Sequence, residues 1–202
     1  MVAAIALVLG SVLLGLSLAT SPGDEAFYPL TASVALVWVL GGLASGPLHL
    51  GWIPWRDELR RPVLTPLLLG LLTAAAFVAG AGIMREIGPL RRVAADVLEH
   101  ASRGNTALVY LVTLANGVAE EIFFRGAVYA ALGRRHPVLI STVIYAAVTV
   151  ATANPLLVFA AVVMGTVFAL QRRASGGILA PMITHVTWSS AMVLALPPLL
   201  PR

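Results

Sequence analysis

The sequence predicts an all-α fold: a polytopic transmembrane helix bundle of about seven spans in a single membrane domain, residues 1–202. Of its 202 residues, 59% are hydrophobic and 11% are charged, whereas soluble domains carry about 25% charged residues. Five runs contain no Asp, Glu, Lys or Arg: residues 1–23, 26–55, 62–84, 136–171 and 174–201. Each run can hold a membrane helix of about 17–25 residues. Continuous apolar runs favour helices over the alternating strands of a membrane barrel.

Turn and breaker residues divide the chain into its expected spans. These are residues 2–19, 27–43, 64–84, 106–132, 138–152, 156–170 and 178–196. Because residues 1–6 carry no basic side chain, we expect the first segment to be a retained helix rather than a signal peptide. The fifth and sixth spans are short for a hydrocarbon core of about 30 Å at about 1.5 Å per residue. Such short spans suit a bundle with a thinned or water-filled centre.

Two polar segments are expected at the membrane surface. Residues 52–61 carry three arginines and two tryptophans, which is typical of an interfacial belt. Residues 85–103 alternate charged and apolar residues at near-helical spacing, which predicts a short amphipathic surface helix.

All 13 basic residues are arginines, and the net charge is +4. Their positions between apolar segments favour contact with lipid headgroups over nucleic-acid binding. With the amino terminus inside, seven arginines lie inside and five outside, a modest positive-inside bias. The lysine-free, Ala- and Val-rich composition indicates a GC-rich bacterial genome, so we expect an integral protein of a bacterial plasma membrane.

The fourth span is exceptional because Glu120, Glu121 and Arg125 lie near its middle. A charge at membrane depth costs at least about 2.5 kcal/mol on insertion scales, so such residues are usually paired or functional. Glu121 and Arg125, four residues apart, share a helix face and can form an ion pair. Glu120 is rotated by about 100° and shares its face with Asn116. The spacing predicts one neutralised carboxylate and one general base, or else a charge cluster that only locks helices together.

The last span supplies a partner for such a base. His185 follows Pro181 in the first turns of this span, and Ser189 comes one helical turn later. Taken alone, a histidine here fits either a bond to a backbone carbonyl or a catalytic role.

The pattern Glu120-Glu121-x-x-x-Arg125, followed by Pro181-x-x-x-His185, resembles the CPBP family. This is the CAAX-protease and bacteriocin-processing (Abi) group of intramembrane endopeptidases. The resemblance covers residues 105–195, which we interpret as a catalytic-type core. It implies that Glu120 activates water, that His185 positions this water and stabilises the oxyanion, and that Glu121 and Arg125 orient the helix. The residues expected to support them are Thr149, Ser189 and Asn116.

One histidine of the family pattern is missing. Where the family has an aromatic residue followed four positions later by histidine, this chain has Tyr145 and Thr149. The family's final histidine and asparagine-like residue correspond to His185 and Ser189. Threonine donates one hydrogen bond, but it cannot become a cation and is a poor metal ligand. Thr149 is therefore expected either to be an oxyanion donor or to mark a weakened or lost activity.

The donor set argues against zinc. A catalytic zinc takes three protein ligands and an open position. Only Glu120, Glu121 and His185 are available, and we expect Arg125 to occupy Glu121. We therefore expect no stably bound zinc and no other cofactor.

The expected partners are membrane lipid and a membrane-associated peptide or protein substrate that enters laterally between helices. A catalytically degenerate CPBP-type scaffold or immunity protein is the alternative, and Thr149 is its best support. A transporter or proton relay is a third class, since intramembrane carboxylates are common there. No inverted repeats are visible to favour it.

Overall fold

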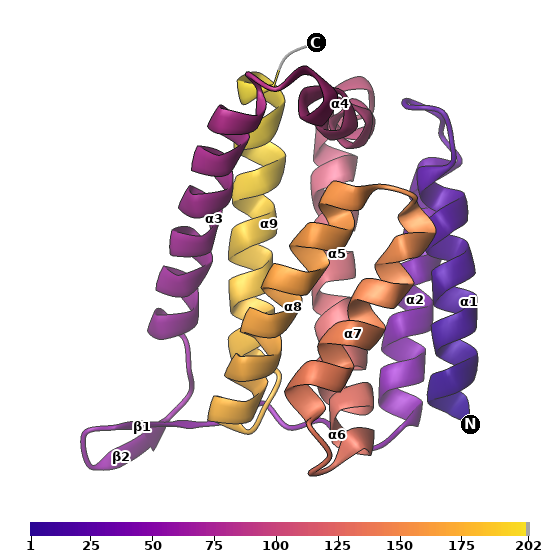
Figure 1. Ribbon diagram of the computed structural model, residues 1–202. Helices are drawn as coiled ribbons and strands as arrows, with labels where there is room; N and C mark the ends of the chain where they lie inside the picture. The colour runs from indigo at the N-terminus through magenta and orange to yellow at the C-terminus, as the bar shows by residue number, and fades with distance from the viewer. Residues whose placement is uncertain (201–202) are drawn as a thin grey trace.

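The computed structural model describes residues 1–200, apart from the side chains of residues 96, 97 and 100–102, and it confirms an all-α bundle. The helices stand side by side between two ends that carry the connecting loops (Figure 1). They are α1 (Val2–Leu18), α2 (Phe27–Ala44), α3 (Leu64–Met84), α4 (Gly88–Arg103), α5 (Thr106–Glu120), α6 (Tyr129–Leu132), α7 (Pro137–Thr149), α8 (Pro155–Ser175) and α9 (Leu179–Leu199). A π-helical segment, η1 (Glu121–Val128), joins α5 to α6, and a 3₁₀ turn, η2 (Val150–Thr152), extends α7.

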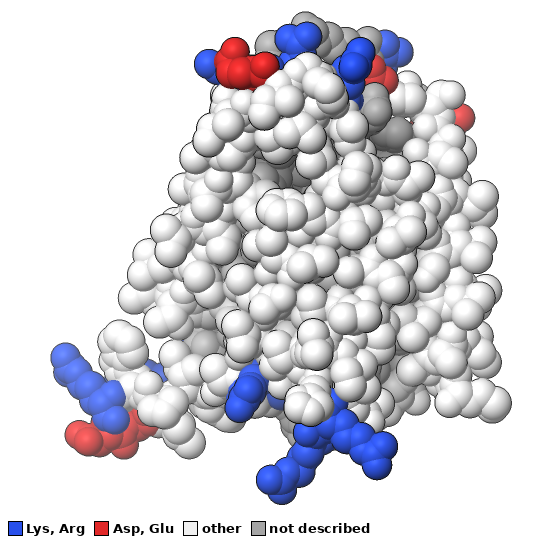
Figure 2. All heavy atoms as spheres, viewed as in Figure 1, with Lys and Arg blue, Asp and Glu red and all other residues white. Residues whose placement is uncertain are grey.

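Within residues 1–200, five helical segments are long and apolar enough to cross a membrane: Phe27–Ala44, Leu64–Met84, Thr106–Leu132, Pro155–Ser175 and Leu179–Leu199. The first and fifth expected spans are the shorter apolar helices Val2–Leu18 and Pro137–Thr152. On the face shown in Figure 2, charged groups gather at the two ends and leave the middle band without charge. The chain is therefore an integral membrane protein, although not all seven expected spans have full length.

The sixth expected span is longer than predicted. The helix α8 continues past residue 170 through Arg172 and Arg173 to Ser175. It ends at Gly176, whose φ of 70° is left-handed and suits a glycine C-cap. The predicted end at residue 170 was too early because Arg172 and Arg173 follow it. Arginines near a helix end can extend towards the headgroups without ending the helix.

Residues 53–60 form a β-hairpin, an addition to the all-α prediction. The strands β1 (Ile53–Trp55) and β2 (Glu58–Arg60) pair antiparallel. Next to them, the Arg61 guanidinium lies 3.6 Å above the Trp52 ring and donates to the Gly51 carbonyl at 2.8 Å. Strands of three residues are too short to show alternating apolar and polar residues. The sequence therefore predicts only an interfacial belt in this segment. The hairpin lies at the same end as the α6–α7 and α8–α9 connections (Figure 1).

The amphipathic surface helix is confirmed as α4, which crosses the opposite end of the bundle (Figure 1). Its Ala94 is buried, and the Val93 carbonyl accepts a hydrogen bond from Asn154 Nδ2 at 3.0 Å. The Asn154 Oδ1 atom also accepts from the first backbone N–H groups of α8. Asn154 thus caps α8 and fastens α4 to it.

The largest cluster of buried apolar residues lies beside the charged part of the fourth span. Trp38 of α2 stacks on Phe123 at 4.8 Å between ring centroids, and Phe124 packs against both. All three side chains are at most 1% exposed. A Cβ at Gly10 would overlap the Trp38 ring, and one at Gly41 would lie 2.6 Å from Ala6. Glycine therefore lets α1, α2 and η1 pack closely, as small residues do between membrane helices.

Candidate active site

The fourth span changes its helical geometry at the two glutamates. Glu120 ends α5, and Glu121 begins the π-helical turns of η1. The sequence predicted a regular α-helix here, so the π-helix is a correction. Single π-helical turns are rare and occur often at functional sites. A π-helical turn is wider than an α-helical turn, so successive side chains are separated by a different angle. In this geometry, Glu120 and Glu121 both lie close to His185.

Glu121 and Arg125 form the ion pair that their spacing predicts. Arg125 Nη1 lies 3.0 Å from Glu121 Oε1, and both side chains are completely buried. Arg125 Nη2 donates to the Gly165 carbonyl of α8 at 3.0 Å. The guanidinium also lies near the rings of Tyr145 and Phe168, at 4.7 and 5.0 Å from their centroids. These contacts hold the cation between η1, α7 and α8.

His185 of α9 lies against both carboxylates. Its Nδ1 is 2.9 Å from Glu121 Oε1, so an ionised Glu121 accepts the Nδ1–H. Its Nε2 then faces Glu120, with 4.0 Å to Oε2. Phe168 stacks on one face of the imidazole at 4.6 Å, and the α5 backbone at Gly117 passes close to the ring, where a Cβ would lie 3.3 Å from Cδ2. The ring orientation is therefore fixed from several sides.

Glu120 has a different environment from Glu121. Its side chain is 17% exposed, against 0% for Glu121. Its Oε2 accepts a hydrogen bond from the Tyr145 hydroxyl at 2.5 Å. One carboxylate is thus enclosed by Arg125 and His185, whereas the other is held by a neutral hydroxyl and is not completely buried.

Tyr145 is the site residue that sequence reasoning missed. The sequence identifies Tyr145 only as the aromatic member of a motif, but its hydroxyl contacts Glu120 directly. Phe124 packs edge-on against its ring at 4.9 Å, and a Cβ at Gly165 would lie 3.1 Å from it. A phenol in a charge-free span was the available signal, since a buried tyrosine hydroxyl usually has a hydrogen-bond partner.

The three supporting residues have other contacts. Thr149 is buried rather than lipid-facing, and its hydroxyl donates to the Tyr145 carbonyl of its own helix at 2.9 Å. Asn116 Nδ2 donates to the carbonyls of Val112 and Thr31, each at 2.9 Å, and so ties α5 to α2. Ser189 is buried one turn beyond His185. Thr149 would have to leave its helix bond to donate to an oxyanion.

The residues present do not fit a catalytic zinc ion. Within the described part of the chain, no group of three His, Cys, Asp or Glu side chains is arranged to hold a metal. At the site, Glu121 Oε1 already accepts from Arg125 and faces His185 Nδ1. The other Glu121 oxygen, Oε2, is buried and has no hydrogen-bond partner among the described residues.

The fold and the site define a class: a polytopic membrane protein with a buried Glu–Glu–Arg–His cluster. Residues 102–191 match the family model described as type II CAAX prenyl endopeptidase Rce1-like. This segment is thus similar to the Rce1-like family, in agreement with the resemblance to the CPBP group. Neither the comparison with curated proteins nor that with solved structures gives a match.

Proposed function

We propose that the chain is an intramembrane endopeptidase that hydrolyses peptide bonds of membrane-associated proteins or peptides with a glutamate-activated water. The family of residues 102–191 supports a protease of the CAAX type. One observation carries the proposal furthest: the His185 imidazole lies 2.9 Å from one carboxylate and 4.0 Å from the other. This arrangement places a general base, Glu120, beside a hydrogen-bond donor, His185, that can stabilise an oxyanion.

Glu120 is the general base in this proposal. Tyr145 and His185 both approach its Oε2, so Oε1 can accept a proton from water. The water oxygen bonds to the carbonyl carbon of the substrate as Glu120 takes the proton. When the C–N bond breaks, Glu120 returns this proton to the leaving amine. General base catalysis of this kind typically contributes about 10²–10⁴-fold in rate.

His185 is the group that stabilises the oxyanion. A protonated imidazole donates Nδ1–H to Glu121 and directs Nε2–H towards the space beside Glu120. In this form it faces both carboxylates, and Arg125 pairs with Glu121 beside it. A fixed donor at an oxyanion is typically worth about 10²–10³ in rate.

The proposal needs no metal. Glu120 activates the water that a metal ion would otherwise activate. His185 stabilises the oxyanion in place of a Lewis acid. Tyr145 replaces the missing second histidine as the polar group that α7 directs at Glu120, one helical turn before Thr149.

The test is cleavage of a fluorogenic peptide library by protein reconstituted in lipid vesicles. The Glu120→Gln variant keeps the shape of the side chain but loses the base, so activity should fall by about 10²–10⁴-fold. The matched control is Glu86→Gln, because Glu86 pairs with Arg85 on the exposed surface and should not affect cleavage. Equal cleavage by wild type and Glu120→Gln would reject the mechanism.

The alternative is a catalytically degenerate scaffold or immunity protein that keeps the buried ion pair for stability. Thr149 at a family histidine position favours it. In that case the wild-type protein would not cleave any peptide of the library, while variants of Arg125 would still lower its stability.

A further inference from the structure

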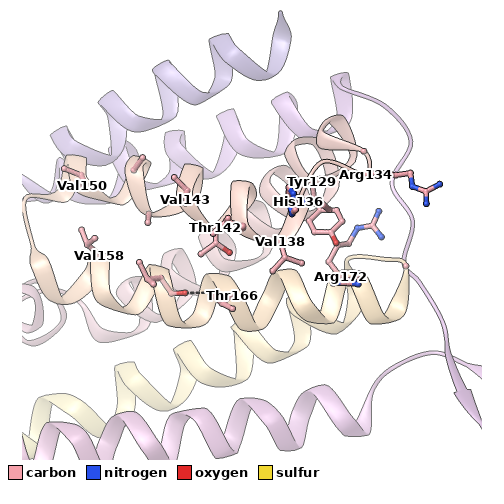
Figure 3. A pocket seen from close by; sticks show the side chains of 18 residues that line it. Tyr129, Arg134, His136, Val138, Thr142, Val143, Val150, Val158, Thr166 and Arg172 are labelled. Carbon is pink, nitrogen blue, oxygen red and sulfur yellow. Dashed lines mark hydrogen bonds between the residues drawn. The ribbon is translucent and has the colours of Figure 1, made fainter.

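A lateral groove between α7 and α8 is separate from the catalytic cluster. Its volume is about 1020 Å³, slightly above the range of about 300–1,000 Å³ usual for ligand pockets. Its walls are largely aliphatic and include Val143 on α7, Val150 on η2 and Val158 on α8 (Figure 3). Within residues 1–200, Glu120 and His185 are not among the side chains that line it. The groove is therefore a second candidate binding site.

One end of the groove is basic. Arg134, His136 and Arg172 lie at this end, beside the α6–α7 turn, and Val150 and Val158 lie at the other end (Figure 3). Arg173, which follows Arg172 in the chain, also lines the groove. Positive charge followed by an apolar channel matches an amphiphile with an anionic head and a long apolar tail.

Arg172 is already oriented for an anion. Its Nε donates to the Arg125 carbonyl at 2.8 Å, and its guanidinium lies 5.4 Å from the centroid of the Tyr129 ring. In the part of the chain that the structure describes, this is the only hydrogen bond of its side chain, so both Nη groups remain for a ligand. A fixed guanidinium suits phosphate, whose oxygens accept two parallel hydrogen bonds from it.

Thr142 provides a second, independent sign of a ligand. It lines the groove and is 7% exposed, yet its Oγ1 has no hydrogen-bond partner among the described residues. On the facing wall, Thr166 donates to the Val162 carbonyl at 2.7 Å (Figure 3). A buried hydroxyl without a partner is unfavourable, so a bound acceptor at Thr142 would offset this cost.

The depth of Thr142 fits the shape of a phospholipid. It lies five residues beyond Pro137, or about 7.5 Å along the helix at about 1.5 Å per residue. The ester carbonyls of a phospholipid lie between the phosphate and the acyl chains. A phosphate at the arginines would therefore bring an ester carbonyl near the Thr142 hydroxyl and the acyl chains along the valines.

We propose that this groove binds one anionic phospholipid, with its phosphate at Arg172, Arg134 and Arg173 and an ester carbonyl at Thr142. A prenylated peptide with a free carboxylate has a related chemistry. The lipid is favoured because a peptide substrate must reach Glu120, which does not line the groove.

The test measures retention of spin-labelled phosphatidylglycerol and phosphatidylcholine by the protein in phosphatidylcholine vesicles. Wild type should retain phosphatidylglycerol in preference. In the double variant Arg134→Gln/Arg173→Gln, the ratio of retained phosphatidylglycerol to phosphatidylcholine should fall by up to about fivefold for each arginine removed. The control pair Arg56→Gln/Arg135→Gln removes the same charge from the same end but outside the groove, and should change little. Equal retention of both lipids, or an equal loss in the control, would overturn the proposal.

A second pair of variants tests the hydroxyl. Thr142→Val keeps the side-chain volume and should weaken retention of phosphatidylglycerol about two- to tenfold, as for one lost hydrogen bond. Thr73→Val in α3, outside the groove, removes a hydroxyl that bonds only within its own helix and should have no effect. No change in Thr142→Val would overturn the proposed ester contact. Displacement of the labelled lipid by a farnesylated peptide carboxylate, but not by its amide, would overturn the lipid assignment and make the groove a substrate site.

Discussion

The Tyr145 hydroxyl donates a hydrogen bond of 2.5 Å to Glu120 Oε2 and so joins α7 to the partly exposed carboxylate of the site. Thr149, one helical turn later on the same helix, bonds the Tyr145 carbonyl instead. The polar contact of α7 to Glu120 therefore comes from the phenol of Tyr145.

Tyr145→Phe should lower the catalytic rate without unfolding the protein. The change removes the hydroxyl and leaves the ring packed against Phe124. A hydrogen bond to a charged group is worth about 1.5–3 kcal/mol, so we expect a loss of about tenfold to hundredfold in kcat. Peptide cleavage in vesicles measures it. Tyr110→Phe is the matched control, because it removes a hydroxyl bonded to Ser190 at 3.0 Å outside the cluster; an equal loss there would contradict a specific role of Tyr145.

Thr149→Val distinguishes the two roles expected for Thr149. Its hydroxyl bonds the Tyr145 carbonyl within α7, so an isosteric valine should change kcat by less than about threefold, as for a weak neutral hydrogen bond. An oxyanion donor would instead cost about 10²–10³ in rate. Steady-state kinetics of peptide cleavage measure the change in kcat. A loss of about 10²–10³-fold would show that Thr149 is an oxyanion donor.

The position of the ion pair was predictable from the sequence, but the details of the site were not. A spacing of four residues places Glu121 and Arg125 on one face in almost any helix, because the relation is local. The role of Tyr145 depends on how α7 packs against η1, where Gly165 gives the ring room. The π-helical turn and the short hairpin depend on packing and leave no pattern of their own. The long apolar runs predicted the helix bundle, since lipid admits few alternatives.

Arg125→Met should destabilise the protein strongly. Removing one partner of a completely buried ion pair leaves Glu121 with an uncompensated charge, at a cost of about 3–5 kcal/mol. The expected result is a markedly lower midpoint of thermal unfolding in detergent. Arg60→Met removes a partner of the exposed pair with Glu58, which should contribute only about 0–1 kcal/mol. Similar midpoints for both variants would contradict a stabilising role of the buried pair.

Metal chelation should leave peptide cleavage unchanged. Among the described residues, no three His, Cys, Asp or Glu side chains are arranged to hold a metal, whereas a catalytic zinc usually takes three protein ligands. Activity is measured after dialysis against EDTA, and elemental analysis gives the metal content of the same samples. Stoichiometric zinc that leaves with activity, and restores it when added back, would refute the metal-free mechanism.

Gly117→Ala should impair catalysis although alanine favours helices. The His185 ring lies between Phe168 and the α5 backbone, and a Cβ at Gly117 would come within 3.3 Å of it. The ring can yield only by changing its distances to the two carboxylates, and small misplacements of catalytic groups can cost about 10²-fold in rate. Gly82→Ala in α3 is the control: its Cβ would meet nothing within 4 Å, so the gain in helix propensity of about 0.5–1 kcal/mol should appear as a stabilisation. The two variants thus make the same chemical change with opposite expectations. Full activity of Gly117→Ala would mean that the ring position in the structure is not the one that catalysis requires.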